Sequence, residues 1–121
     1  MFKYALSLLA ILSSGSFAST VTLKCHVDES VAHVPAHISK YQVIKTGKDR
    51  FALEVFFASN PSKGYSYALT PAGDGDEDYS EYNVASNHAS TVNVQAAYIQ
   101  ESFNWADLID TDGESFAHCV R

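Results

Sequence analysis

The sequence predicts an all-β fold: a small antiparallel β-sandwich or barrel of about six or seven strands, closed by one disulfide. Three observations predict it. Apolar and polar residues alternate over several short segments, which is the period of a strand with one buried face. Turn-forming residues separate these segments. The chain's two cysteines, Cys25 and Cys119, stand in the first and the last of them.

The alternating segments follow one another from residue 20 to the end of the chain. Strands are predicted over 20–27, 38–45, 50–58, 65–69, 92–98 and 115–120, with a further one over 79–84. In the segment 92–98, the residues that share the apolar face are Val92, Val94, Ala96 and Tyr98. The turn residues in 46–49 and 60–64 predict short connections. Near 104–109, Asn104 as a helix cap and an apolar face formed by Trp105, Leu108 and Ile109 predict one short helix.

The first eighteen residues have the layout of a cleavable secretory signal. Lys3 is followed by an apolar run over 5–12 and then by small residues up to Ala18. The run is shorter than the roughly 20 residues that span a bilayer, so no membrane insertion is expected after cleavage. We predict cleavage after Ala18, a single β-rich domain over 19–121, and a periplasmic or secreted location.

The cysteines of an exported chain are expected to pair, because disulfides persist in oxidising compartments. Free thiols, an intermolecular bridge and a shared metal ion are the alternatives. If the first and last strands pair antiparallel with Cys25 opposite Cys119, then His26 and His118 face each other on the outer surface. Two such imidazoles are candidate ligands for Zn²⁺ or Cu²⁺, and ordinary surface histidines are the alternative interpretation.

Charge is distributed unevenly along the chain. The sequence has 8 basic and 14 acidic side chains, a net charge of −6. The stretch from Gly64 to Val120 contains no Lys or Arg. Its acidic residues are Asp74, Asp76, Glu77, Asp78, Glu81, Glu101, Asp107, Asp110, Asp112 and Glu114. Such a surface repels phosphates, so nucleic acid is not expected as a partner. The negative charge is explained equally by a basic protein partner, by a bound metal ion, or by a role in solubility alone.

The acidic segment 74–78 begins like a calcium-binding loop, with carboxylates at alternate positions. However, an EF-hand loop requires Gly at its sixth position and Glu at its twelfth, where this chain has Tyr79 and Ala85. A Ca²⁺ site becomes plausible only if this loop meets the second acidic loop, 110–114. Two separate solvated loops are the alternative.

The predicted function is that of an exported, non-enzymatic binding protein, an inhibitor or immunity-type factor for a cationic protein. Tyrosine and tryptophan beside carboxylates are typical of surfaces that bind basic proteins. Ordinary core and sheet-face residues are the alternative interpretation of these aromatic side chains. The predicted partner-binding residues are Asp76, Asp78, Tyr79, Tyr82, Trp105 and Asp112. A metal-binding envelope protein that holds Ca²⁺ in its acidic loops, or Zn²⁺ or Cu²⁺ between histidines, is the alternative. No nucleophile or acid–base pair stands in a recognisable catalytic motif, and no other cofactor is expected.

In size, export and disulfide use the chain is similar to the small exported β-barrel inhibitors of lysozyme. Their signature contains Tyr-x-x-x-Thr-Lys-Gly, which the segment 41–47 has with Thr and Lys exchanged. The Ser-Gly-x-x-Tyr motif that precedes it in those inhibitors has no counterpart here. The similarity therefore implies only the general class of exported binding protein.

Overall fold

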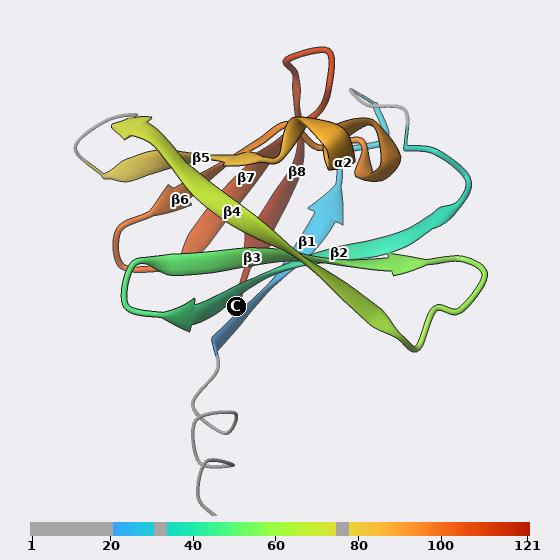
Figure 1. The fold of residues 1–121 in the computed structure, drawn as a ribbon, viewed down its shortest axis with the longest axis horizontal. Helices are drawn as coiled ribbons and strands as arrows, with labels where there is room; N and C mark the ends of the chain where they lie inside the picture. The colour runs from blue at the N-terminus through green and yellow to red at the C-terminus, as the bar shows by residue number, and fades with distance from the viewer. Residues whose placement is uncertain (1–20, 31–33, 75–77) are drawn as a thin grey trace, which may run out of the picture.

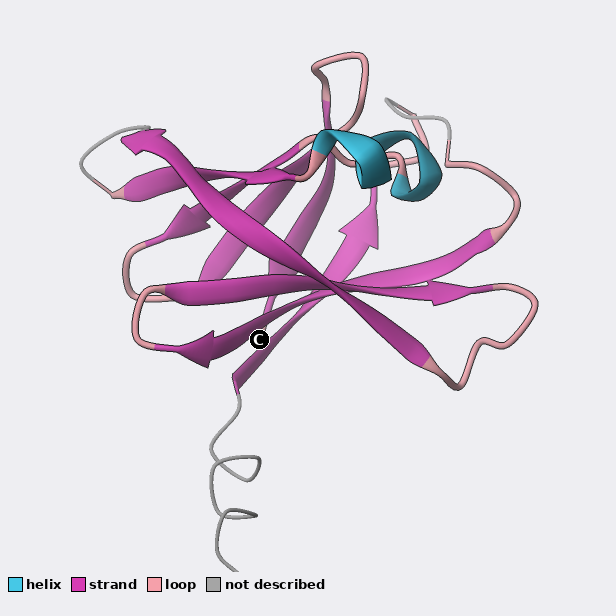
Figure 2. Ribbon diagram, in the orientation of Figure 1, coloured by secondary structure: helices cyan, strands magenta, loops and turns pink. Residues whose placement is uncertain are grey.

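A computed structural model describes residues 21–30, 34–74 and 78–121, so the predicted signal sequence lies outside the described residues. Over these residues, eight antiparallel strands close into a barrel in the order of the sequence (Figure 1). The strands are β1 (Val21–Val27), β2 (Ile38–Gly47), β3 (Arg50–Phe57), β4 (Gly64–Asp74), β5 (Tyr79–Val84), β6 (Ala96–Gln100), β7 (Trp105–Ile109) and β8 (Ser115–Val120). Figure 2 shows that the short helix α2 (Ser86–Val92) lies against a structure otherwise built of strands. The predicted all-β class is confirmed, as a barrel.

The barrel is closed by β1, which pairs with both β2 and β8. Residues Val21–Lys24 pair with β2, and Lys24–Val27 pair with β8. Cys25 is directly opposite Cys119, and the two form the predicted disulfide. The covalent bond therefore links the two strands at which the barrel closes, and the same register places His26 opposite His118.

The predicted helix near 104–109 is wrong, because Trp105–Ile109 forms β7. Ala106 and Leu108 are fully buried, whereas Trp105 and Asp107 are partly exposed, which is the alternation of a strand. The segment hydrogen-bonds to β6 on one side and β8 on the other. A five-residue segment that gains two strand partners adopts the strand whatever its helical preference.

The predicted strand over 92–98 begins later and with the opposite phase. Val92 ends α2, and Asn93 adopts a left-handed conformation (φ 60°) that terminates the helix. The strand β6 starts only at Ala96. Its inward-pointing residues are Ala97 and Ile99, instead of the predicted Ala96 and Tyr98, so Tyr98 lies on the outer surface.

Side chains fill the barrel interior. Tyr41, Phe116 and Leu53 are among the largest fully buried residues. The rings of Tyr41 and Phe116 meet edge to face at 5.5 Å, and the Tyr41 hydroxyl donates a hydrogen bond of 2.6 Å to the carbonyl of Val92. That bond ties the end of α2 to the core, as expected for a small barrel whose interior is packed.

Burial raises the pKa of Tyr41, which predicts alkaline destabilisation. The folded state favours the neutral phenol, whereas the unfolded chain ionises near pH 10. The stability conferred by the neutral phenol is complete below that pH and is lost as pH rises further, by about 1.4 kcal/mol per pH unit for one such group. Urea denaturation between pH 8 and pH 12 measures this slope.

The variant Tyr41→Phe is expected to have a smaller alkaline slope than the wild type. At neutral pH it is expected to lose about 1–2 kcal/mol, because the Val92 carbonyl loses its donor. Tyr82, whose pKa is also raised by burial, keeps part of the slope in this variant. An unchanged slope would contradict the assignment to Tyr41.

Candidate functional site

One row of polar and aromatic side chains crosses five neighbouring strands on the outside of the barrel. In the hydrogen-bond register, Glu81 pairs with Tyr98, Tyr98 with Asp107, Asp107 with His118, and His118 with His26. Directly paired residues lie on the same face of a sheet, with side chains close enough to interact. Their chain neighbours, including Ala97, Ala106 and Leu108, are buried in the interior, so this row faces outward.

Aromatic rings lie beside this row and touch one another. The ring of Tyr79 is 5.3 Å from that of Tyr98 and 5.9 Å from that of Trp105, and the Trp105 ring is 6.2 Å from His118. The three aromatic residues are partly exposed. We call this surface the outer aromatic patch; it consists of Tyr79, Glu81, Tyr98, Trp105, Asp107 and His118.

The hairpin between β6 and β7 positions the patch. Its residue Phe103 is buried with a positive φ of 55°, and its carbonyl accepts a hydrogen bond of 3.0 Å from the Arg121 guanidinium. The amide of Asn104 donates to the side chain of Gln100 (3.0 Å). This tightly bonded turn sets the start of β7 and therefore the position of Trp105.

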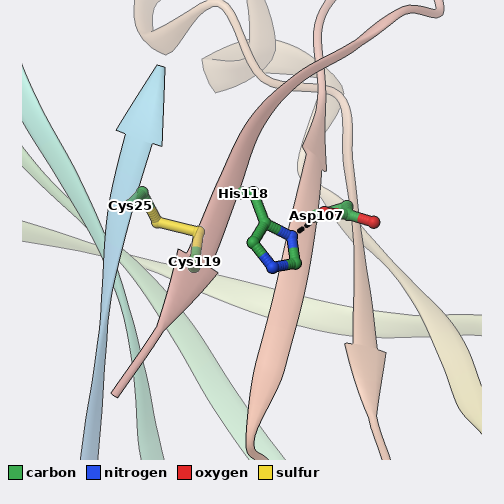
Figure 3. Close-up of polar contacts among 4 residues, drawn as sticks. All are labelled: Cys25, Asp107, His118 and Cys119. Carbon is green, nitrogen blue, oxygen red and sulfur yellow. Dashed lines mark hydrogen bonds and ion pairs between the residues drawn. A yellow bond between two sulfur atoms is a disulfide. The ribbon is translucent and has the colours of Figure 1, made fainter. Parts of the chain in front are cut away.

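A short hydrogen bond joins the two polar groups at the centre of the patch. His118 Nδ1 lies 2.6 Å from Asp107 Oδ1, and the two side chains are 58% and 32% exposed. Figure 3 shows the imidazole turned toward Asp107 and away from the Cys25–Cys119 disulfide. The bond orients both groups at a surface that a partner can reach.

The predicted metal ligands His26 and His118 are opposite each other in the register. Figure 3 shows that the His118 ring turns to Asp107, on the side of β8 away from β1, which carries His26. Within the described parts of the chain, no group of three or more His, Cys, Asp or Glu side chains is placed to hold a metal ion. Metal binding by the pair stays a prediction.

The structure separates the residues that the sequence predicts to bind a partner. Tyr79 and Trp105 lie in the outer aromatic patch, and Asp78 is exposed just before Tyr79. Tyr82 is only 9% exposed, because its position in β5 points inward, so it lies in the core and not on the partner surface. Asp76 falls outside the described residues.

The two acidic loops lie at opposite ends of the sheet. Asp78 precedes β5 at the end where Tyr79 pairs with Gln100, whereas Asp112 follows β7 at the end where Ile109 pairs with Ala96. Asp112 is therefore remote from the patch. A shared calcium site requires the two acidic loops to meet. Asp78, which directly follows the undescribed segment 75–77, lies at the other end of the sheet from Asp112 and does not meet this requirement.

Asp110 has a structural role in its own loop. It is 5% exposed, and its carboxylate accepts hydrogen bonds from the amides of Asp112 (3.0 Å) and Glu114 (2.9 Å). Gly113 completes the turn with a φ of 88°, a conformation that glycine adopts without strain. These hydrogen bonds explain why a carboxylate is buried at this position without a bound ligand.

Three patch residues, Glu81, Tyr98 and Asp107, are absent from the predicted site. The predicted strand over 92–98 places Tyr98 on the same face as Val92, Val94 and Ala96, and Asp107 falls in the predicted helix. Alternation in 105–109, with Ala106 and Leu108 on one face and Trp105 and Asp107 on the other, is the signal that identifies Asp107 as a surface residue.

No protein-family model matches this chain, and comparisons with curated proteins and with solved structures find no match either. Within the described residues, no helix has the length and apolar character needed to cross a membrane.

Proposed function

We propose that this protein is an exported, non-enzymatic binding protein that docks on a basic protein through the outer aromatic patch. The observation that carries the proposal is the contact between Tyr79, Tyr98 and Trp105 on the outside of the barrel, beside the carboxylates of Glu81 and Asp107. An inhibitor or immunity-type factor is the kind of protein that uses such a surface.

The energetics of docking support this assignment. Partly exposed aromatic rings lose their remaining water contact when a partner covers them, and Trp and Tyr are enriched among the residues that dominate binding energy. Carboxylates around them attract a basic partner and accelerate its encounter. The exposed residues Asp78 and Glu101 extend the negative charge beyond the patch.

Charges near the patch are mostly of one sign. The strands from β4 to β8 contain no Lys or Arg, and the basic group in them that contacts a patch carboxylate is the imidazole of His118, which is bonded to Asp107. Arg121 lies at the border, where its guanidinium donates to the carbonyls of Phe103 and Ser102. The Cys25–Cys119 disulfide supports the export part of the proposal, because such bonds persist in oxidising compartments.

Replacing Trp105 by alanine is expected to weaken partner binding by about 30-fold or more, the effect of losing an interface residue worth about 2 kcal/mol. In the assay, the immobilised, oxidised protein is used to capture a partner from the secreted or periplasmic proteins of the source cells. The dissociation constant of the purified partner is then measured at low and high salt. Salt is expected to weaken binding, since it screens charges at an exposed interface.

Phe56→Ala is the matched control. Phe56 is a partly exposed ring on β3, four strands from β7 in a ring of eight, and Lys40 Nζ lies 4.5 Å above it. This variant is expected to bind as the wild type does. Capture of no basic protein, binding indifferent to salt, or equal loss in both variants would each overturn the proposal.

A further inference from the structure

We infer that the outer aromatic patch contains a subsite for one arginine side chain of the partner, formed by Glu81, Tyr98 and Asp107. The inference rests on the proposed function and specifies the chemical group that the patch binds. It follows from the order of the three residues across β5, β6 and β7.

The aromatic ring of the subsite stands between two carboxylates. Tyr98 pairs with Glu81 on one side and with Asp107 on the other, so all three side chains leave the barrel in one row. Neighbours in such a row have Cβ atoms about 4.5–5.5 Å apart. A cation over the Tyr98 ring is therefore within reach of both acidic side chains, and ring and carboxylates attract it together.

The planar form of the guanidinium group favours arginine over lysine. It stacks on an aromatic ring and at the same time donates in its own plane to carboxylates, whereas an ammonium group is a compact, strongly hydrated charge. The rings of Tyr79 and Trp105 continue the aromatic surface beside Tyr98, which suits a flat group.

Asp107 is oriented for such a contact. Its Oδ1 is bonded to His118 Nδ1 at 2.6 Å, so Oδ2 is the oxygen that accepts from an arginine, and the side chain remains 32% exposed. In the described part of the chain, Asp107 Oδ1 is paired with the imidazole of His118, and no Lys or Arg forms an ion pair with Asp107 or Glu81. Asp107 Oδ2 and the carboxylate of Glu81 are the oxygens to which an arginine from a partner donates.

Trp105 makes the test direct, because it is the only tryptophan of the chain. The oxidised protein is titrated with N-acetyl-argininamide while the fluorescence of Trp105 is recorded. The lysine and citrulline analogues are the comparison ligands, since citrulline has nearly the shape of arginine but no charge. A saturable change is expected with arginine, a several-fold weaker affinity with lysine, and no saturation with citrulline.

Substitutions in the row of Glu81, Tyr98 and Asp107 show which of these residues bind the arginine analogue. Glu81→Gln, Asp107→Asn and Tyr98→Leu are each expected to weaken arginine binding by about tenfold, the size of one charge-assisted hydrogen bond for the two carboxylates and of one cation–π contact for Tyr98. Glu54→Gln is the matched control, because Glu54 is a partly exposed carboxylate on β3, on the opposite side of the barrel. Circular dichroism verifies that each variant is folded.

The outcomes separate the subsite from the proposed function. Absence of a saturable change, an equal response to citrulline, or equal weakening by Glu54→Gln overturns the subsite. If the subsite fails while Trp105→Ala still weakens the binding of a captured basic partner, the proposed function stands without the subsite. If arginine binds as expected and no basic protein is captured, the subsite stands and the proposed function fails.

Discussion

Paired Cys25→Ala and Cys119→Ala substitutions are expected to lower the free energy of unfolding by about 4–5 kcal/mol. The disulfide joins residues separated by 94 positions, so it closes a loop that includes almost the whole barrel. For a loop of that length, the loss of chain entropy in the unfolded state predicts a stabilisation of about this size. Alanine at both positions avoids a free thiol and a buried hydroxyl.

Urea denaturation of the double variant measures the effect. Reduction of the wild type by dithiothreitol is the matched control, since it breaks the same disulfide without replacing any residue. Both are expected to unfold at lower urea concentration. A loss below about 1 kcal/mol in both would show that the pairing of β1 with β8 holds the barrel closed without the covalent bond.

Phe116→Ala is expected to destabilise the protein by about 3–5 kcal/mol. Phe116 is fully buried and packs edge to face on Tyr41, so its removal costs apolar burial and leaves a cavity in the filled interior. Thermal and urea denaturation measure the loss. The matched control is Phe56→Ala, which removes a partly exposed ring from the outside of β3 and is expected to cost far less.

Equal losses in Phe116→Ala and Phe56→Ala would contradict the filled interior as the main source of stability. The expected difference also bears on function. Because packed side chains occupy the interior, the strands have only their outer side available for a partner. Along β7, buried and partly exposed residues alternate: Ala106 and Leu108 pack in the core, and Trp105 and Asp107 lie on the patch. Patch substitutions are therefore expected to change binding without unfolding the barrel.

The outer aromatic patch was only partly predictable, for a reason visible in β6 and β7. Because Ala97 and Ile99 form the buried side of β6, Tyr98 is exposed, and a strand in place of a helix exposes Asp107. Both differences concern the phase or type of a short segment, where local preferences are weak and pairing partners decide. Of the predicted partner-binding residues, Tyr79 and Trp105 are partly exposed, whereas Tyr82 is buried. Tyr82 is three positions after Tyr79, and an odd separation places two residues of a strand on opposite faces.

The sequence by itself determined the all-β class and, through the only pairing that two cysteines allow within one chain, the Cys25–Cys119 disulfide. It predicted that His26 opposes His118 only on the condition that the first and last strands pair with the cysteines opposite each other, and the structure satisfies that condition. Only the tertiary structure decided that the sheet closes as a barrel, that β7 is a strand, and that Glu81, Tyr98 and Asp107 form one row. Such features depend on hydrogen bonds between segments far apart along the chain, and a local pattern contains no information about which segments pair.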